Sequence, residues 1–195
     1  MPELQPLSKD QIDSIGFKVE GGSLNRQLYE SQPRPFEVEV FKHTTFKDAN
    51  GGYFTEVARF DGGNIQALKE RGIEADFSRG QVSFSRVACG TERFGHVHPD
   101  QDELWYVSTG VLSMGLLDLR VDSPTEGQKY KLIIPEGTSL YIPHGVVHGF
   151  GNYGNEPVNL FYFPSYQFRA DEKSQELRFI SDDPTFWDFV KPDKI

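Results

Sequence analysis

The chain has 195 residues, a formal net charge of -9 and one cysteine, with 37% hydrophobic and 13% aromatic residues. This length is typical of one folded domain with a sizeable core, and the aromatic content excludes a disordered chain. The negative charge offers no broad positive field to a nucleic acid or an anionic membrane, and no apolar run is long enough to span a bilayer. We therefore expect neither kind of partner.

The N-terminal sequence and the cysteine content both bear on location. MPELQPLSKDQIDSIGF lacks the basic start and apolar run of a secretory signal. Cys89 is the only cysteine, so no intrachain disulfide can form. We expect a cytoplasmic protein in which Cys89 is a small buried residue.

Two short helices are expected. SKDQIDSIGF begins at Ser8, a suitable N-cap, and NIQALKERG has Asn64 in the cap position and Gly72 at its end. Between them, the proline-containing stretch ESQPRPF joins an N-terminal arm over residues 1–35 to a main domain over residues 36–195, which ends in a C-terminal extension.

Strands dominate the main domain. FEVEVF, at residues 36–41, alternates apolar and polar side chains with the period of a strand. Strand-like segments follow, each bounded by Gly, Pro, Asp or Asn: YFTEVARF, QVSFSRVA, LWYVSTGVLSMGLLDL, YKLII, SLYIP and PVNLFYF. Many short strands at this spacing predict an all-β sandwich or barrel.

Four histidines fall in two short stretches, GHVHPDQDEL and GTSLYIPHGVVHGFGN. Residues two apart in a strand point to the same face, so His96 and His98 project together, and Glu103 begins the strand after the intervening turn. His148 follows a Pro-x-Gly turn from which it can reach the same place. Imidazoles and a carboxylate suit a divalent transition metal such as Fe, Mn, Ni or Zn. His43 and His144 are expected to be structural.

The spacing within these stretches resembles both signature motifs of the cupin superfamily. The first is Gly, five residues, His-x-His, four residues, Glu, six residues, Gly, and the second is Gly, five residues, Pro-x-Gly, two residues, His, three residues, Asn. The resemblance implies a double-stranded β-helix, or jelly-roll barrel. It also implies a metal ion in the barrel, bound by His96, His98, Glu103 and His148.

A second, more particular resemblance covers roughly residues 40 to 190. DLRVDSPTEGQ, SFSRVACGTERFGH, IPHGVVHGF and SDDPTFWDF are similar to stretches of the dTDP-4-dehydrorhamnose 3,5-epimerase family, as is GGYFTE near the start of the domain. This resemblance implies an enzyme that acts on a sugar or nucleotide sugar through an enolate or enediol. We also expect a homodimer, because barrels of this kind often exchange edge strands or arms.

The family's active site implies roles for individual residues. His96 matches the base that removes a proton beside the sugar ketone, Asp183 the aspartate that orients it, and Tyr162 a tyrosine near the sugar. Arg93 matches a substrate-binding arginine. Arg86 and Tyr106 are further candidates for substrate binding.

Two positions depart from the family's pattern. Glu103 stands where the family has a lysine that stabilises the enolate, and Phe168 stands where it has a tyrosine. An imidazole nitrogen bound to a metal has no lone pair left to accept a proton, so His96 cannot be ligand and base through one nitrogen. Because the lysine is lost at the same position that gains the acidic ligand, we expect a metal to replace the lysine as the electrophile.

Three functional classes are compatible with these residues. The first is a sugar epimerase or isomerase, indicated by the family resemblance. The second is a cupin-type iron dioxygenase, because three histidines and one carboxylate leave open positions on iron. The third is a non-catalytic sugar-binding cupin, which the missing lysine and tyrosine favour.

Overall fold

The computed structural model describes residues 37–170 and 175–192. Short β-strands make up nearly all of its regular structure, which confirms the all-β prediction. The elements are β1 (Glu39–Lys42), β2 (Thr45–Lys47), β3 (Tyr53–Thr55), β4 (Phe60–Asp61), β5 (Asn64–Ile65), α2 (Gln66–Lys69), β6 (Ser83–Val87), β7 (Glu92–Val97), β8 (Glu103–Thr109), β9 (Val111–Asp118), β10 (Lys129–Pro135), β11 (Thr138–Ile142), β12 (Val146–Gly151), β13 (Val158–Pro164), β14 (Leu177–Arg178) and the 3-10 helix η2 (Asp188–Val190).

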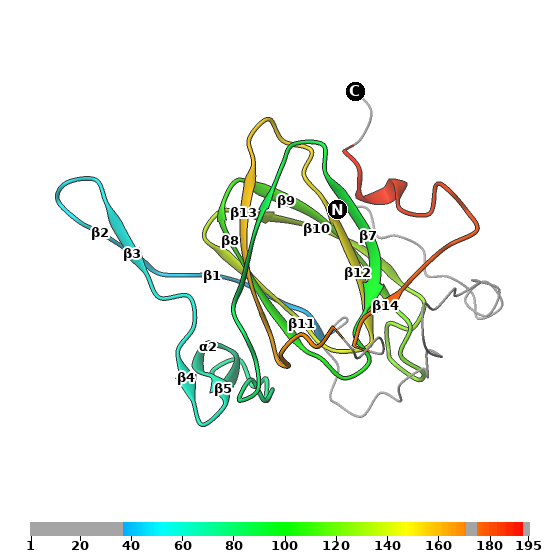
Figure 1. Ribbon diagram of the computed structural model, residues 1–195, viewed down its shortest axis with the longest axis horizontal. Coiled ribbons are helices and arrows are strands. Elements are labelled where there is room, and N and C mark those ends of the chain that lie inside the picture. Colours follow the sequence, from blue (N-terminus) through cyan, green and yellow to red (C-terminus); the bar gives the residue numbers. More distant parts are fainter. Residues whose placement is uncertain (1–36, 171–174, 193–195) are drawn as a thin grey trace.

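Two five-stranded sheets form the barrel (Figure 1). The first has the order β1-β11-β8-β13-β6 and the second the order β10-β9-β12-β7-β14. Strand pairs in both sheets are antiparallel, and most join strands that are distant in sequence. This arrangement places β7, β8 and β12 in the wall of one barrel, so the two histidine motifs that they carry share its interior.

The main core lies between the sheets. Strand alternation turns Trp105 and Val107 of β8 inward, where they belong to one buried cluster with Leu116 of β9 and Leu140 of β11. Outside the first sheet, Leu68 of α2 packs in a cluster with residues of β8 and β11. Outside the second sheet, Phe179 and Phe186 of the C-terminal segment pack in a cluster with residues of β9 and β12. Central strands are therefore buried on both faces, which explains their nearly continuous apolar sequence.

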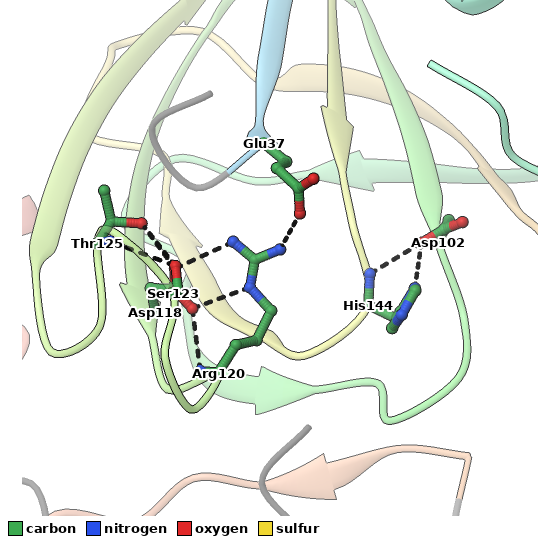
Figure 2. Close-up of polar contacts among 7 residues, drawn as sticks. All are labelled: Glu37, Asp102, Asp118, Arg120, Ser123, Thr125 and His144. Carbon is green, nitrogen blue, oxygen red and sulfur yellow. Dashed lines mark hydrogen bonds and ion pairs between the residues drawn. The ribbon is translucent and has the colours of Figure 1, made fainter. Parts of the chain in front are cut away.

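The stretch DLRVDSPTEG forms a polar network at one end of the barrel (Figure 2). Nε of Arg120 donates to Oδ1 of Asp118 at 3.0 Å, and Glu37 at the start of the described chain pairs with the same guanidinium. Hydroxyls of Ser123 and Thr125 also donate to Asp118. Asp118 is fully buried, so these partners compensate a charge that would otherwise be costly. None of these residues belongs to the cluster of His96, His98, Glu103 and His148.

Three local predictions are corrected. Asn64 does not cap a helix: it lies in β5, its Oδ1 accepts the backbone N–H of Ala75 at 3.2 Å, and α2 begins only at Gln66. Cys89 is exposed, because it lies in the turn between β6 and β7 and not in a strand. The same helix was expected to end at Gly72, but α2 ends at Lys69 with Glu70 as its C-cap. Gly72 lies in the turn that follows, with a positive φ of 71° and an N–H bond to the carbonyl of Lys69.

The expected N-terminal helix and the arm over residues 1–35 lie outside the described residues. Within the described ranges, no helix combines the length and apolar character needed to cross a membrane. The β2–β3 hairpin projects away from the barrel (Figure 1), and its apolar side chains Phe46, Tyr53 and Phe54 are exposed.

Candidate metal and substrate site

A cavity of about 390 Å³ is lined by strands of both sheets. Its walls combine apolar and aromatic side chains with a few polar ones, as is usual for a small-molecule site. Ser83 and Ser85 come from β6, Glu103 and Trp105 from β8, and His96 from β7. The cavity is therefore the place where the two predicted motifs meet.

The four predicted metal ligands converge at the wall of this cavity: His96, His98 and Glu103 line it, and His148 is buried beside them. His148 of β12 pairs directly with His96 of β7, and strand alternation puts His98 on the same face as His96. Glu103 enters from the facing sheet as the first residue of β8. One potential ligand atom from each residue lies within 4.8 Å of those of the others. This geometry is compact enough for a single ion to contact all four.

The hydrogen bonds of two imidazoles show which nitrogens face the centre. Nδ1 of His98 lies 2.6 Å from the carbonyl of Gln175, and Nδ1 of His148 lies 3.0 Å from the carbonyl of Val146. A carbonyl can only accept, so each Nδ1 carries the proton, and Nε2 of the neutral ring is left with a lone pair. Backbone partners of this kind orient the histidine ligands of metal sites.

The inward nitrogens need a positive partner. Nε2 of His98 lies 3.4 Å, and Nε2 of His148 lies 3.2 Å, from the carboxylate oxygens of Glu103. Both nitrogens are buried, and among the described residues neither has a hydrogen-bond partner. Lone pairs of imidazole and carboxylate repel each other unless a proton or a cation lies between them. The residues thus fit a metal ion bound by three nitrogens and one oxygen.

The charge states of the cluster favour metal binding. Burial alone would raise the pKa of Glu103, but positive charge on protonated imidazoles of His98 and His148 and a hydrogen bond from Trp105 lower the pKa to about 2. When the two rings are neutral, a bound cation would supply that positive charge instead. Burial and the neighbouring histidines hold the pKa of His96 well below its usual value. At neutral pH Glu103 is therefore ionised and His96 neutral, and these are the forms that coordinate metals.

Two side chains hold the carboxylate of Glu103 from behind. Nε1 of Trp105 donates to Oε2 at 2.9 Å, and Nε2 of Gln101 donates to Oε1 at 3.2 Å. Both donors are buried. They fix the orientation of the carboxylate toward the three imidazoles.

Comparisons with known proteins identify the family. The model of the dTDP-4-dehydrorhamnose 3,5-epimerase family matches residues 36–187. The chain belongs to this family. The resemblance seen in its motifs is thereby confirmed, and the family is one of sugar-nucleotide epimerases and isomerases.

Relatives and solved structures agree with this assignment. The chain is 32% identical over 136 residues to the spore coat polysaccharide biosynthesis protein SpsL of Bacillus subtilis, an alignment that covers 69% of this chain and 82% of that protein. It is 27% identical, with a TM-score of 0.59, to dTDP-4-dehydrorhamnose 3,5-epimerase from Bacillus anthracis, solved with TDP and PPi bound, over 74% of this chain and 79% of that one.

A more distant structure supports the fold. ChmJ, a 3′-monoepimerase from Streptomyces bikiniensis solved in complex with dTDP-quinovose, is 21% identical with a TM-score of 0.63, over 81% of this chain and 76% of that one. With these neighbours the predicted cupin jelly roll is also confirmed.

Two of the other predicted site residues face the cavity. Tyr162 of β13 is half-buried in its wall, with its ring 6.3 Å from that of Trp105. Arg93 of β7 also lines the cavity, and its guanidinium carbon lies 5.8 Å from the ring centre of Phe150. Phe168 is at the cavity rim and is 71% exposed. Both Tyr162 and Arg93 can therefore contact a bound sugar.

Three predicted site residues lie outside the cavity lining, which does not support the roles expected of them. Arg86 is exposed on β6, on the face opposite to Ser83 and Ser85. Tyr106 points outward from β8 because it follows Trp105, and its ring packs edge-on against His43, 5.2 Å away. Asp183 is exposed, and its Oδ1 accepts the backbone N–H of Thr185 at 2.8 Å in a local turn.

Sequence reasoning missed several residues of the site, among them Gln101, Trp105 and Arg178. Gln101 and Trp105 stand beside Glu103 in the first motif, so strand alternation applied from Glu103 would have placed Trp105 inward. Arg178 also lines the cavity, but it lies in the two-residue strand β14, which no sequence pattern marks.

Proposed function

We propose that the protein is a metal-dependent epimerase or isomerase of a sugar or nucleotide sugar, acting through an enolate or enediol. The observation that carries the proposal is the cluster of His96, His98, Glu103 and His148 at the cavity wall of a member of this family. A site with three nitrogen ligands and one oxygen ligand suits Fe, Mn, Ni or Zn.

A metal ion bound by these residues would act as a Lewis acid on a sugar carbonyl oxygen. This chemistry accounts for the acidic residue at position 103. A free carboxylate there would oppose the negative charge that develops on an enolate, whereas a ligated one is neutralised. We accordingly assign His96 to metal ligation and not to proton abstraction. Asp183 lies outside the cavity, and it has no imidazolium to stabilise because a ligated His96 does not accept a proton.

Proton transfer then falls to a group that is not a ligand. Tyr162 lines the cavity beside Trp105, and its side chain can donate a proton to the sugar as the phenol or accept one from it as the phenolate. Arg93 lies on the same strand as His96, where it can hold the substrate. Both assignments follow from position in the cavity and from the chemistry of the side chains.

The test is hydrogen exchange at the sugar carbon next to a ketone, followed by NMR in D₂O with a dTDP-4-keto sugar. We expect exchange by the metal-loaded wild type, loss of exchange after chelation, and recovery when metal is restored. Tyr162→Phe should lower the rate by about 100-fold or more, as is typical for loss of a general acid or base. Exchange that survives complete removal of metal would overturn metal dependence. Oxygen uptake with iron but no exchange would instead identify the dioxygenase alternative.

We also propose a homodimer in the cytoplasm. The projecting β2–β3 hairpin exposes Phe46 and Phe54, which are 61% and 62% exposed and pair across the two strands. Exposed aromatic residues on a projecting hairpin favour burial against a second copy of the chain. The cytoplasmic assignment rests on the single cysteine, which cannot form an intrachain disulfide.

A further inference from the structure

Two turns cross between the sheets next to the proposed metal ligands. The first turn, residues 98–102, leads from β7 of the second sheet to β8 of the first, and the second turn, residues 143–145, leads from β11 of the first sheet to β12 of the second. Glu103 directly follows the first turn, and His148 follows the second by three residues. The ligands therefore come from both sheets, and the distances between them depend on how these two turns are held.

Asp102 of the first turn accepts two hydrogen bonds from His144 of the second (Figure 2). The backbone N–H of His144 donates to Oδ1 of Asp102 at 2.9 Å, and Nδ1 of the imidazole lies 2.8 Å from the same oxygen. A carboxylate oxygen can only accept, so this Nδ1 carries a proton and donates it to the bond. The Asp102–His144 pair thus joins the two turns, although 42 positions separate its members in the sequence.

Backbone bonds attach the Asp102–His144 pair to the rest of the site. The N–H of Gly145 donates to the carbonyl of His98 at 2.8 Å, which links the second turn to a ligand. The backbone N–H of Asp102 donates to Oγ of Ser165 at 3.0 Å, and the carbonyl of Asp102 accepts the N–H of Ser165 at 2.8 Å. Ser165 follows β13, so Asp102 is fixed to the first sheet while His144 leads into the second.

The surroundings of the pair strengthen its side-chain bond. The side chain of Asp102 is only 14% exposed, whereas that of His144 is 49% exposed. The hydrogen bond to Asp102 raises the pKa of His144, and the negative charges of Asp102 and Asp100 act in the same direction, while burial and Arg120 oppose them. A bond to a carboxylate that is largely shielded from water contributes more than an ion pair on the open surface.

Neither member of the pair can bind the metal or the substrate itself. Asp102 and His144 do not line the cavity, and neither belongs to the cluster of four potential ligands. They can act on the site only through the backbone that carries the ligands. An Oε2 of Glu103 lies 3.2 Å from Nε2 of His148, so a small shift of one turn against the other would change the ligand geometry. Support of this kind keeps a metal site preorganised.

We propose that Asp102 and His144 are positioning residues of the metal site, because their hydrogen bonds hold the two turns together and thereby fix Glu103 relative to His148. The inference rests on the metal site of the proposed function. It implies that the ligands are already close together before the ion binds, so that less reorganisation opposes binding.

Metal affinity and the visible spectrum of bound Co²⁺ test the inference. Competition with a chromophoric chelator gives the affinities for Zn²⁺ and Co²⁺, and the Co²⁺ bands report the coordination geometry. We expect His144→Ala to weaken binding about 3- to 30-fold, less than the 10- to 100-fold usual for partners that contact a ligand directly, and to alter the Co²⁺ bands. Asp102→Ala should weaken binding at least as much, because it removes the acceptor of both bonds.

His144→Asn should restore most of the affinity and the wild-type spectrum, because its amide can donate from close to the position of Nδ1. Asp100→Asn is the matched control. Asp100 is an exposed carboxylate of the same turn, so its substitution removes a nearby negative charge and leaves the Asp102–His144 pair intact. Its affinities should stay within about twofold of the wild type. All affinities are measured at a temperature at which circular dichroism shows every variant to be folded.

Two results would overturn the inference and leave the metal site standing: affinities of His144→Ala and Asp102→Ala within about twofold of the wild type, or equal losses in His144→Asn and His144→Ala. Wild type that binds neither Zn²⁺ nor Co²⁺ would reject the metal site and the inference with it. Metal binding that depends on the Asp102–His144 pair, without proton exchange at the sugar, would support the inference and reject the proposed reaction.

Discussion

Trp105→Phe isolates the contribution of one hydrogen bond to metal binding. The substitution removes the indole N–H that donates to Oε2 of Glu103 at 2.9 Å and keeps an aromatic ring in the core. A hydrogen bond to a charged group contributes about 1.5–3 kcal/mol, and about 1.4 kcal/mol corresponds to a factor of ten. We therefore expect metal affinity to fall about 10- to 100-fold, the range usual for partners that orient metal ligands.

The assay is competition for Zn²⁺ or Co²⁺ between the protein and a chromophoric chelator. The smaller phenyl ring also leaves the core less well packed. The control variant must therefore reduce side-chain volume in the core without changing a contact to the carboxylate of Glu103. Val107→Ala serves, because Val107 is the next inward residue of β8, is buried in the same cluster and has no polar side-chain atom. It should lower the melting temperature and leave metal affinity almost unchanged. Equal affinities of Trp105→Phe and wild type would refute the orienting role of the indole.

Three further predictions concern stability and assembly. Asp118→Asn should destabilise the protein by about 3 kcal/mol in urea unfolding, because it breaks a buried ion pair and leaves Arg120 paired with the carboxylate of Glu37. In the wild type, burial would raise the pKa of Asp118, but hydrogen bonds from Arg120 outweigh burial and lower this pKa below 3.8. The ionised carboxylate of Asp118 therefore contributes its full stabilisation above about pH 4, and this contribution is lost as the pH falls through the folded-state pKa. A pH series of melting curves would show the loss. Gly115→Ala would place Cβ 2.4 Å from Cγ2 of Val190, so we expect overpacking to cost about 1–3 kcal/mol, and an unchanged melting temperature would contradict this packing. Phe46→Ser should shift the protein from dimer to monomer in analytical ultracentrifugation, and a wild type that sediments as a monomer would reject the proposed dimer.

Much of the site could be predicted because its signals are local. His96, His98 and Glu103 lie within one turn and its flanking strands, where the period of two determines which side chains share a face. His148 was predicted from the spacing of a second, equally local motif. The same rule, applied from Glu103, excludes Tyr106 from the cavity, because three residues along a strand reverse the face.

The remaining site residues depend on tertiary contacts. Nothing near Arg86 reveals which face of β6 looks inward, since small serines and not apolar residues line the cavity there. Arg178 is positioned by a two-residue strand whose partner is far away in sequence. Asp183 was expected at the cavity on the strength of the family motif alone, but its carboxylate is used in a local turn. Pairing between distant strands carries no local sequence signal.

The same distinction holds for the fold. Strand segments and the turn at Gly72 after α2 follow from alternation and turn residues. The side chain of Asn64, by contrast, binds the backbone of Ala75 and not the helix start, and Cys89 is exposed by the position of a turn. These outcomes depend on which distant segments of the chain pack together, and local secondary-structure propensity does not determine that.

Metal content tests the central proposal most directly. Mass spectrometry of purified protein should show close to one Fe, Mn, Ni or Zn per chain in wild type and in His43→Ala, whose histidine bonds Ser139 and does not line the cavity. His98→Ala and Glu103→Ala should lose most of it. Wild type that holds no metal as purified, and none after incubation with each ion, would contradict the metal site and return His96 to the role of a free base.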